Sequence, residues 1–111
     1  MSDSKMTWFE VPAENADRAR TFYGGLFGWQ FQAFDETGDY QVTDEGAVSS
    51  SDRKGLLLYF STSDIVASVA RVGELGGDAS EPSGIPGVGR YSTCTDTEGN
   101  AFGLFQPDQA S

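Results

Sequence analysis

Histidine is absent from this sequence, and cysteine occurs once. Histidine is the commonest general base and metal ligand near neutral pH, and Ser-His and Cys-His nucleophile pairs depend on it. Any chemistry of this chain therefore proceeds without imidazole. The single cysteine, Cys94, cannot form an internal disulfide, which is typical of a protein in a reducing compartment.

Long hydrophobic runs are also missing. No apolar stretch approaches the roughly 18 residues that a transmembrane helix needs, and residues 1–6 contain no apolar core of a signal peptide. We therefore expect a cytoplasmic protein that has no membrane partner.

Basic residues are scarce: 7 Lys and Arg stand against 17 Asp and Glu, for a net charge of -10. Such a field repels nucleic acid and anionic membrane surfaces, so we expect no nucleic-acid partner. It favours a cationic ligand. An acidic surface that serves only solubility is the more common explanation of such a charge, and both explanations stay open.

The composition is that of a globular protein, with 38% hydrophobic and 13% aromatic residues in 111 positions. A chain of this length buries about two thirds of its unfolded surface and forms a core without disulfides. We therefore expect a single domain over residues 1–111.

The first half predicts one helix among short strands. Met6–Val11 has the residues of a strand, which we expect Pro12 to stop. A helix is expected over Ala16–Phe27, with Gly28 as its C-cap and one buried face that includes Phe22 and Leu26. The further strands are expected at residues 29–34, 39–43 and about 47–48.

The second half repeats this pattern. A strand at 56–60 precedes a helix that begins at Ser63-Asp64 and ends at Gly76-Gly77. A Gly/Pro-rich loop at 81–90 follows, and then two strands at 91–95 and 101–105 around a turn. We expect two modules with the same order of elements, at about 6–50 and about 55–107.

Several motifs in this order resemble the vicinal oxygen chelate superfamily, which comprises glyoxalases, bleomycin-resistance proteins and extradiol dioxygenases. The motifs are Phe9-Glu-Val-Pro12, Asp17-Arg-Ala19, Phe22-Tyr23, Leu26-Phe-Gly-Trp29, Ile85-Pro-Gly-Val-Gly-Arg90 and Asp96-Thr-Glu-Gly-Asn-Ala-Phe-Gly-Leu-Phe-Gln106. The resemblance implies an α+β fold of two βαβββ modules. Their sheets would form a cupped, incomplete barrel around a ligand cleft, with the helices outside.

Strand alternation then divides the side chains between the two faces of each sheet. The residues expected to face the cleft are Trp8, Glu10, Leu57, Tyr59, Gly103 and Phe105. Their neighbours of opposite parity, such as Phe9, Phe60 and Leu104, are expected to pack beneath the helices. A shift of one residue in register would invert this assignment.

The resemblance also implies a divalent metal, held by His, Gln or Glu on the first and last strands of the modules. The corresponding positions in this chain are Trp8, Leu57, Gly103 and a position near Ala47. None of these side chains offers the lone pair that a metal ion requires. We therefore expect no metal ligands and no cofactor, although a divalent metal is the family expectation.

Glu10 is the strongest single candidate for a functional residue. Burying a carboxylate in mid-strand costs free energy unless the group is solvated, is paired with another group or has a function. In a partly apolar cleft it is a candidate catalytic base. It also suits a cationic group on a ligand, and a solvated or Arg-paired glutamate remains the plainer alternative.

Other candidates have simpler interpretations. Trp29 and Phe31 are equally well explained as packing or as ligand-binding residues. Cys94 is expected to be a buried core thiol. Residues 96–100 predict a hairpin turn with Gly99 or Asn100 at positive φ rather than a calcium loop.

Three functions remain under consideration. The first is a metal-free small-molecule binder, for an aromatic or cationic compound such as an antibiotic. The second is a lyase or isomerase related to lactoylglutathione lyase, with a non-standard site. The third is a regulatory module that acts through a protein partner. The resemblance further implies a homodimer.

Overall fold

The computed structural model describes residues 5–53 and 55–108. The chain forms two compact units. The N-terminal unit is Trp8–Leu57, and the C-terminal unit contains residues 58–108 together with residues 5–7. In the C-terminal unit the Ser61 backbone N–H donates to the Lys5 carbonyl at 2.8 Å, which attaches the start of the chain.

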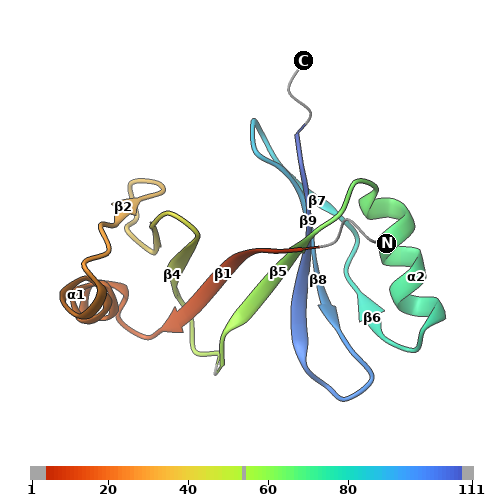
Figure 1. Cartoon of the computed structure of the whole chain (residues 1–111), viewed down its shortest axis with the longest axis horizontal. Helices are drawn as coiled ribbons and strands as arrows, with labels where there is room; N and C mark the ends of the chain where they lie inside the picture. The colour runs from red at the N-terminus through yellow and green to blue at the C-terminus, as the bar shows by residue number, and fades with distance from the viewer. Residues whose placement is uncertain (1–4, 54, 109–111) are drawn as a thin grey trace. The chain divides into compact units, whose positions relative to one another are not determined.

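The N-terminal unit has the order β-α-β-β-β (Figure 1). Its elements are β1 (Met6–Ala13), α1 (Ala16–Phe27), β2 (Gln32–Ala33), β3 (Tyr40–Val42) and β4 (Gly46–Ser50). Strand β1 pairs in parallel with β4, β4 pairs antiparallel with β3, and β3 pairs antiparallel with β2. Helix α1 packs against β4 and β3.

The C-terminal unit repeats this order with one strand interrupted. Its elements are β5 (Leu57–Ser61), α2 (Ile65–Glu74), β6 (Asp78–Ala79), β7 (Ser83–Ile85), β8 (Gly89–Thr95) and β9 (Ala101–Pro107). Strand β5 pairs in parallel with β9, which forms a long antiparallel hairpin with β8. Strands β6 and β7 both pair with β8 and together take the place of a single strand.

Local sequence explains where both helices begin. The Asn15 side chain accepts the Arg18 backbone N–H at 2.9 Å, and the Asp64 side chain accepts that of Ala67 at 3.1 Å. Each bond satisfies an amide that the first turn of a helix leaves without a partner. Gly28 ends α1 in the left-handed conformation, at φ 75°, as predicted.

The core of the C-terminal unit lies between α2 and its sheet. Ile65, Cys94 and Leu104 are its buried residues, and the partly buried side chains packed against them include Phe60 and Val69. Helix α2 contacts β6, β8 and β9 (Figure 1). The expected packing of Phe60 and Leu104 beneath a helix is therefore confirmed.

In the N-terminal unit an aromatic ring lies on a glycine. Phe9 on β1 pairs with Gly46 on β4, and a Cβ atom at Gly46 would lie 2.5 Å from Cγ of the Phe9 ring. Ordinary van der Waals contact is more than an ångström longer, so only glycine admits the ring here. On the same side of the sheet, Val48 and Gln41 are buried opposite each other.

Several predicted boundaries and surfaces were wrong. Strand β1 continues through Pro12 to Ala13, because its pairing with β4 continues to that residue. The strand expected at 29–34 is only Gln32–Ala33, and the loop expected at 81–90 contains β7 and the start of β8. The strand expected at 29–34 is short because Trp29 packs on α1 instead of extending into the sheet.

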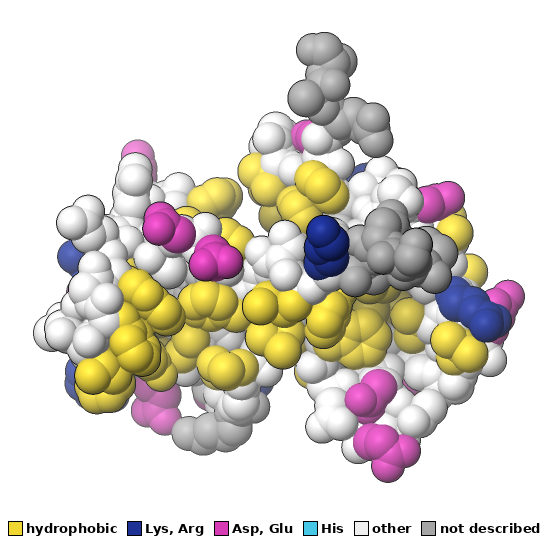
Figure 2. All heavy atoms as spheres, viewed as in Figure 1, with side chains coloured by type: hydrophobic (Ala, Val, Ile, Leu, Met, Phe, Trp, Pro, Cys, Tyr) yellow, Lys and Arg dark blue, Asp and Glu magenta, His cyan; other side chains and the backbone are white. Residues whose placement is uncertain are grey.

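The apolar face of α1 is also less buried than its spacing predicted. Phe22 and Leu26 are each 61% exposed, and Figure 2 shows hydrophobic side chains gathered on the surface over this helix. Tyr23, one position further round, turns inward and stacks near Trp29. No helix in the described part of the chain is long and apolar enough to cross a membrane.

Replacing Ile65 tests the core of the C-terminal unit. Ile65→Ala should lower the free energy of unfolding by about 2–5 kcal/mol, because the residue is fully buried. The adjacent Val66→Ala, on the exposed side of α2, should change it by less than about 0.5 kcal/mol. Urea unfolding of both variants measures the difference, and equal effects would contradict this description of the core.

Candidate functional site

The strand register defines one face of the N-terminal sheet that lies away from α1. Glu10 on β1 pairs with Ala47 on β4, which pairs with Val42 on β3. Tyr40 lies two residues before Val42 and therefore on the same face, as Trp8 does relative to Glu10. Phe9 takes the opposite face, toward the helix.

Trp8, Tyr40 and Glu10 are joined by hydrogen bonds on this face. The Trp8 Nε1–H donates to the Tyr40 hydroxyl at 2.9 Å, and the Tyr40 hydroxyl donates to Glu10 Oε2 at 2.6 Å. All three side chains are half-buried. The mid-strand carboxylate is therefore paired with a phenol rather than with an arginine. We call these three residues the Glu10 network.

Phe34 adds an aromatic surface beside the network. Its ring meets that of Tyr40 edge-on, with centroids 5.9 Å apart and planes at 72°, and it is 57% exposed. The turn between β2 and β3 places it there, since its backbone N–H donates to the Tyr40 carbonyl at 2.8 Å. Sequence reasoning assigned neither Tyr40 nor Phe34 to the candidate site. Their positions on either side of a hairpin turn were the available signal.

The corresponding position in the C-terminal unit is filled by a ring. Tyr59 on β5 pairs with Gly103 on β9, and a Cβ atom at Gly103 would overlap the Tyr59 ring. Because Phe60 packs toward α2, alternation places Tyr59 and Gly103 on the face away from that helix. Tyr59 and Leu57 are buried, whereas Phe105 is half-buried.

At the positions where the resemblance implies metal ligands, the side chains present do not fit a metal ion. The Trp8 indole nitrogen is a donor and is bonded to Tyr40, and Ala47 has no donor atom in its side chain. At Gly103 the Tyr59 ring occupies the space that a ligating side chain would need. Within residues 5–53 and 55–108, no three His, Cys, Asp or Glu side chains form a group that could hold a metal ion.

Trp29 and Phe31, whose roles were open, belong to an aromatic cluster of the N-terminal unit. The Trp29 ring lies 4.8 Å from Phe27, 5.7 Å from Phe9 and 6.4 Å from Phe31, measured between centroids. Phe9 faces α1, so the cluster lies on the helix side of the sheet and not beside Glu10. Both rings therefore take part in packing on the helix side, although Trp29 stays 36% exposed.

Cys94 is a buried core thiol, as predicted. It is 1% exposed, and burial raises the pKa of its thiol, while the hydrogen bond with Ser92 acts in the opposite direction. A buried thiol of raised pKa forms little thiolate at neutral pH. Cys94 is therefore a packing residue rather than a nucleophile.

Residues 96–100 form a hairpin turn, which confirms the sequence interpretation. Asp96 Oδ1 accepts the backbone N–H groups of Asn100 and Glu98, at 2.9 and 2.8 Å. Together with the Asn100 side-chain amide, these bonds lower the pKa of the Asp96 carboxyl. Gly99 has the positive φ, at 85°. The Asp96 oxygens thus stabilise the turn by accepting hydrogen bonds within it.

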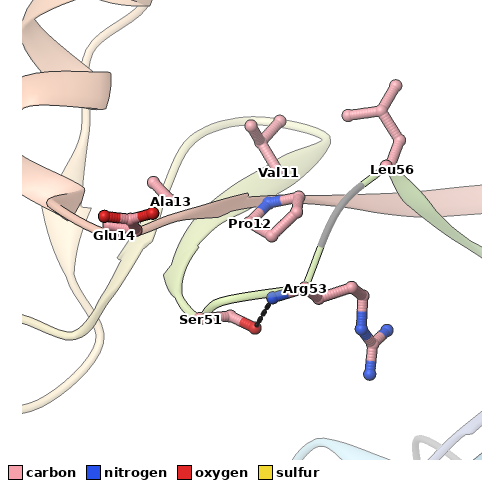
Figure 3. A pocket seen from close by; sticks show the side chains of 8 residues that line it. Val11, Pro12, Ala13, Glu14, Ser51, Arg53 and Leu56 are labelled. Atoms are coloured by element: carbon pink, nitrogen blue, oxygen red, sulfur yellow. Dashed lines mark hydrogen bonds between the residues drawn. The ribbon is translucent and has the colours of Figure 1, made fainter.

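A small pocket opens elsewhere on the N-terminal unit (Figure 3). It has a volume of about 220 Å³ and lies between the end of β1, including Val11 and Pro12, and the loop that carries Ser51 and Arg53. Ligand pockets usually measure about 300–1,000 Å³. In Figure 3 the Arg53 guanidinium extends away from Pro12. No residue of the Glu10 network lines this pocket, so it is not part of the candidate site.

Comparisons with known proteins identify the family of this chain. Residues 5–42 match the family described as Bleomycin resistance protein-like N-terminal. A glyoxylase-like domain-containing protein of Didymella fabae is 30% identical over 118 residues, which cover 90% of this chain and 91% of that protein. The chain therefore belongs to the glyoxalase-like proteins of the vicinal oxygen chelate superfamily.

Solved structures share the fold at lower identity. Methylmalonyl-CoA epimerase from Mycobacterium tuberculosis matches with a TM-score of 0.69 at 13% identity, over 94% of this chain and 88% of that one. Homoprotocatechuate 2,3-dioxygenase from Brevibacterium fuscum matches with a TM-score of 0.74 at 16% identity, over 95% of this chain and 37% of that one. The predicted α+β fold class of two βαβββ modules is thus confirmed.

The overlap between the Tyr59 ring and position 103 can be tested by a double-mutant cycle. Gly103→Ala should lower the free energy of unfolding by about 1–3 kcal/mol through overpacking. In a Tyr59→Ala background the same change should have a smaller effect, with a coupling energy of at least about 1 kcal/mol. Gly73→Ala is the control, because a Cβ atom there meets nothing within 4 Å. Additive effects at 59 and 103 would refute the proposed overlap.

Proposed function

We propose that this protein is a metal-free small-molecule binder of the glyoxalase/bleomycin-resistance type, which takes an aromatic or cationic compound. The observation that carries the proposal is the Glu10 carboxylate, held by Tyr40 beside the Trp8 indole on a half-buried sheet face. A carboxylate among aromatic rings attracts a cation through charge and through the ring faces.

The charge of the whole chain supports this ligand class. A net charge of -10 draws cations toward the surface, and the attraction weakens as salt is added. The Brevibacterium dioxygenase, part of which shares this fold, was solved with 3,4-dihydroxyphenylacetate, a small aromatic compound. The remaining predicted cleft residues, Leu57, Tyr59, Gly103 and Phe105, stay predictions of ligand contact.

A lyase or isomerase related to lactoylglutathione lyase is the second candidate. The Didymella relative is described as glyoxylase-like and a solved neighbour is an epimerase, which favours this alternative. Glu10 would then act as the base. Turnover of a hemithioacetal that is lost in Glu10→Gln would make this the preferred function.

We propose further that the protein is cytoplasmic and forms a homodimer. The chain spans 37% of the Brevibacterium dioxygenase. The association of two copies of the present chain is what the resemblance to the superfamily implies. A mass of one chain in light scattering at working concentrations would contradict the dimer.

Ligand screening by tryptophan fluorescence tests the proposed function. Planar cationic compounds should quench or shift the emission, and Glu10→Gln should weaken their binding by about tenfold because a charged hydrogen bond is lost. Raising the salt concentration from about 50 mM to about 500 mM should weaken binding further in the wild type than in the variant.

Glu36→Gln is the matched control for this screen. It removes the same charge from an exposed position in the turn between β2 and β3 and should change affinity by less than about twofold. If no aromatic or cationic compound in a broad panel perturbs either tryptophan, the proposed function is wrong.

A further inference from the structure

The hydrogen bonds of the Glu10 network have a fixed direction. The indole N–H of Trp8 can only donate, and an ionised carboxylate can only accept. The Tyr40 oxygen therefore accepts from Trp8, at 2.9 Å, and its proton is directed to Glu10 Oε2, at 2.6 Å. A phenol held in this way has its one proton committed to the carboxylate and does not offer it to a ligand.

This arrangement fixes one oxygen of Glu10 and leaves the other for a ligand. Among residues 5–53 and 55–108, no hydrogen-bond donor reaches Glu10 Oε1. Because Oε2 is anchored through Tyr40, the carboxylate is restrained in orientation before any ligand arrives. An acceptor fixed in advance loses less conformational entropy on binding and is more selective for the geometry of its donor.

The surroundings of Glu10 favour a flat ligand. The opposite residue on β4, Ala47, is small and fully buried, so no large side chain on that strand lies beside the carboxylate. The exposed Phe34 ring meets Tyr40 edge-on, and Trp8 supplies a second aromatic surface. Aromatic faces attract cations, and the amidinium and guanidinium groups are both planar and rich in N–H donors.

We propose that Tyr40 is a positioning residue that makes Glu10 selective for a positively charged group bearing N–H bonds on an aromatic frame, such as an amidinium or a guanidinium. The proposal rests on the small-molecule-binding function above and narrows its ligand class. A quaternary ammonium has the same charge but no N–H bond, so it gains the charge and ring contacts without the hydrogen bond to Oε1.

Three probes separate these contributions: benzamidinium, its neutral analogue benzamide, and trimethylphenylammonium. The chain contains two tryptophans, so the indole N–H signals in a ¹H–¹⁵N spectrum report binding, and a Trp29→Phe variant assigns the Trp8 signal. Wild-type protein should bind benzamidinium at least about fivefold more tightly than either other probe.

Tyr40→Phe keeps the ring and removes the hydroxyl. It should weaken benzamidinium binding by about tenfold, change trimethylphenylammonium binding by less than about twofold, and shift the Trp8 indole N–H signal upfield. Tyr23→Phe is the control, since the Tyr23 hydroxyl has no hydrogen-bond partner among the described residues. If the role of Tyr40 were only structural, Tyr40→Phe would weaken the binding of both cations equally.

Each other outcome overturns the proposal. If Tyr40→Phe weakens the binding of both cations equally, or of neither, Tyr40 does not set the selectivity. The same conclusion follows if the wild-type protein binds benzamidinium no better than trimethylphenylammonium. Binding of benzamide or trimethylphenylammonium alone would leave the small-molecule function standing. If none of the three probes binds, the selectivity is refuted, and the broad ligand panel decides whether the function is refuted as well.

Discussion

The pairing of an aromatic ring with a glycine across two parallel strands organises both units. Phe9 lies on Gly46 where β1 meets β4, and Tyr59 lies on Gly103 where β5 meets β9. A side chain at either glycine would displace the ring or separate the strands, because protein interiors leave no spare volume for an added carbon. The first and last strands of each module are held at this point.

The two pairs lie on opposite faces of their sheets, and this difference distinguishes the modules. Phe9 faces its helix, so the other face of β1 carries Glu10, which lies beside the small Ala47 on the neighbouring strand. Tyr59 faces away from its helix and covers the corresponding position with a ring. On the face away from the helix, the first module thus carries the Glu10 carboxylate, and the second module carries the Tyr59 ring. The fold is shared by several enzymes, so the fold alone does not assign an activity to this chain.

The sequence predicted the fold well because its signals are local or carried by motifs. Asn15 and Gly28 cap α1 by their own chemistry, whatever the rest of the chain does. The exposure of Phe22 could not be predicted, since helical spacing groups residues on a face without saying what covers that face. The role of Tyr40 was equally hidden. Its hydroxyl meets Glu10 only through strand register, which links residues thirty positions apart.

The central proposal is that Glu10 and aromatic rings, in place of a metal ion, contact the ligand. The most direct test is the metal content per chain, measured by elemental analysis on protein purified without chelator or affinity tag. The measurement is repeated after loading with nickel, zinc, manganese and iron. We expect no metal above background under either condition. One saturable metal ion per chain would contradict the account and would make a metal-dependent lyase or isomerase the preferred function.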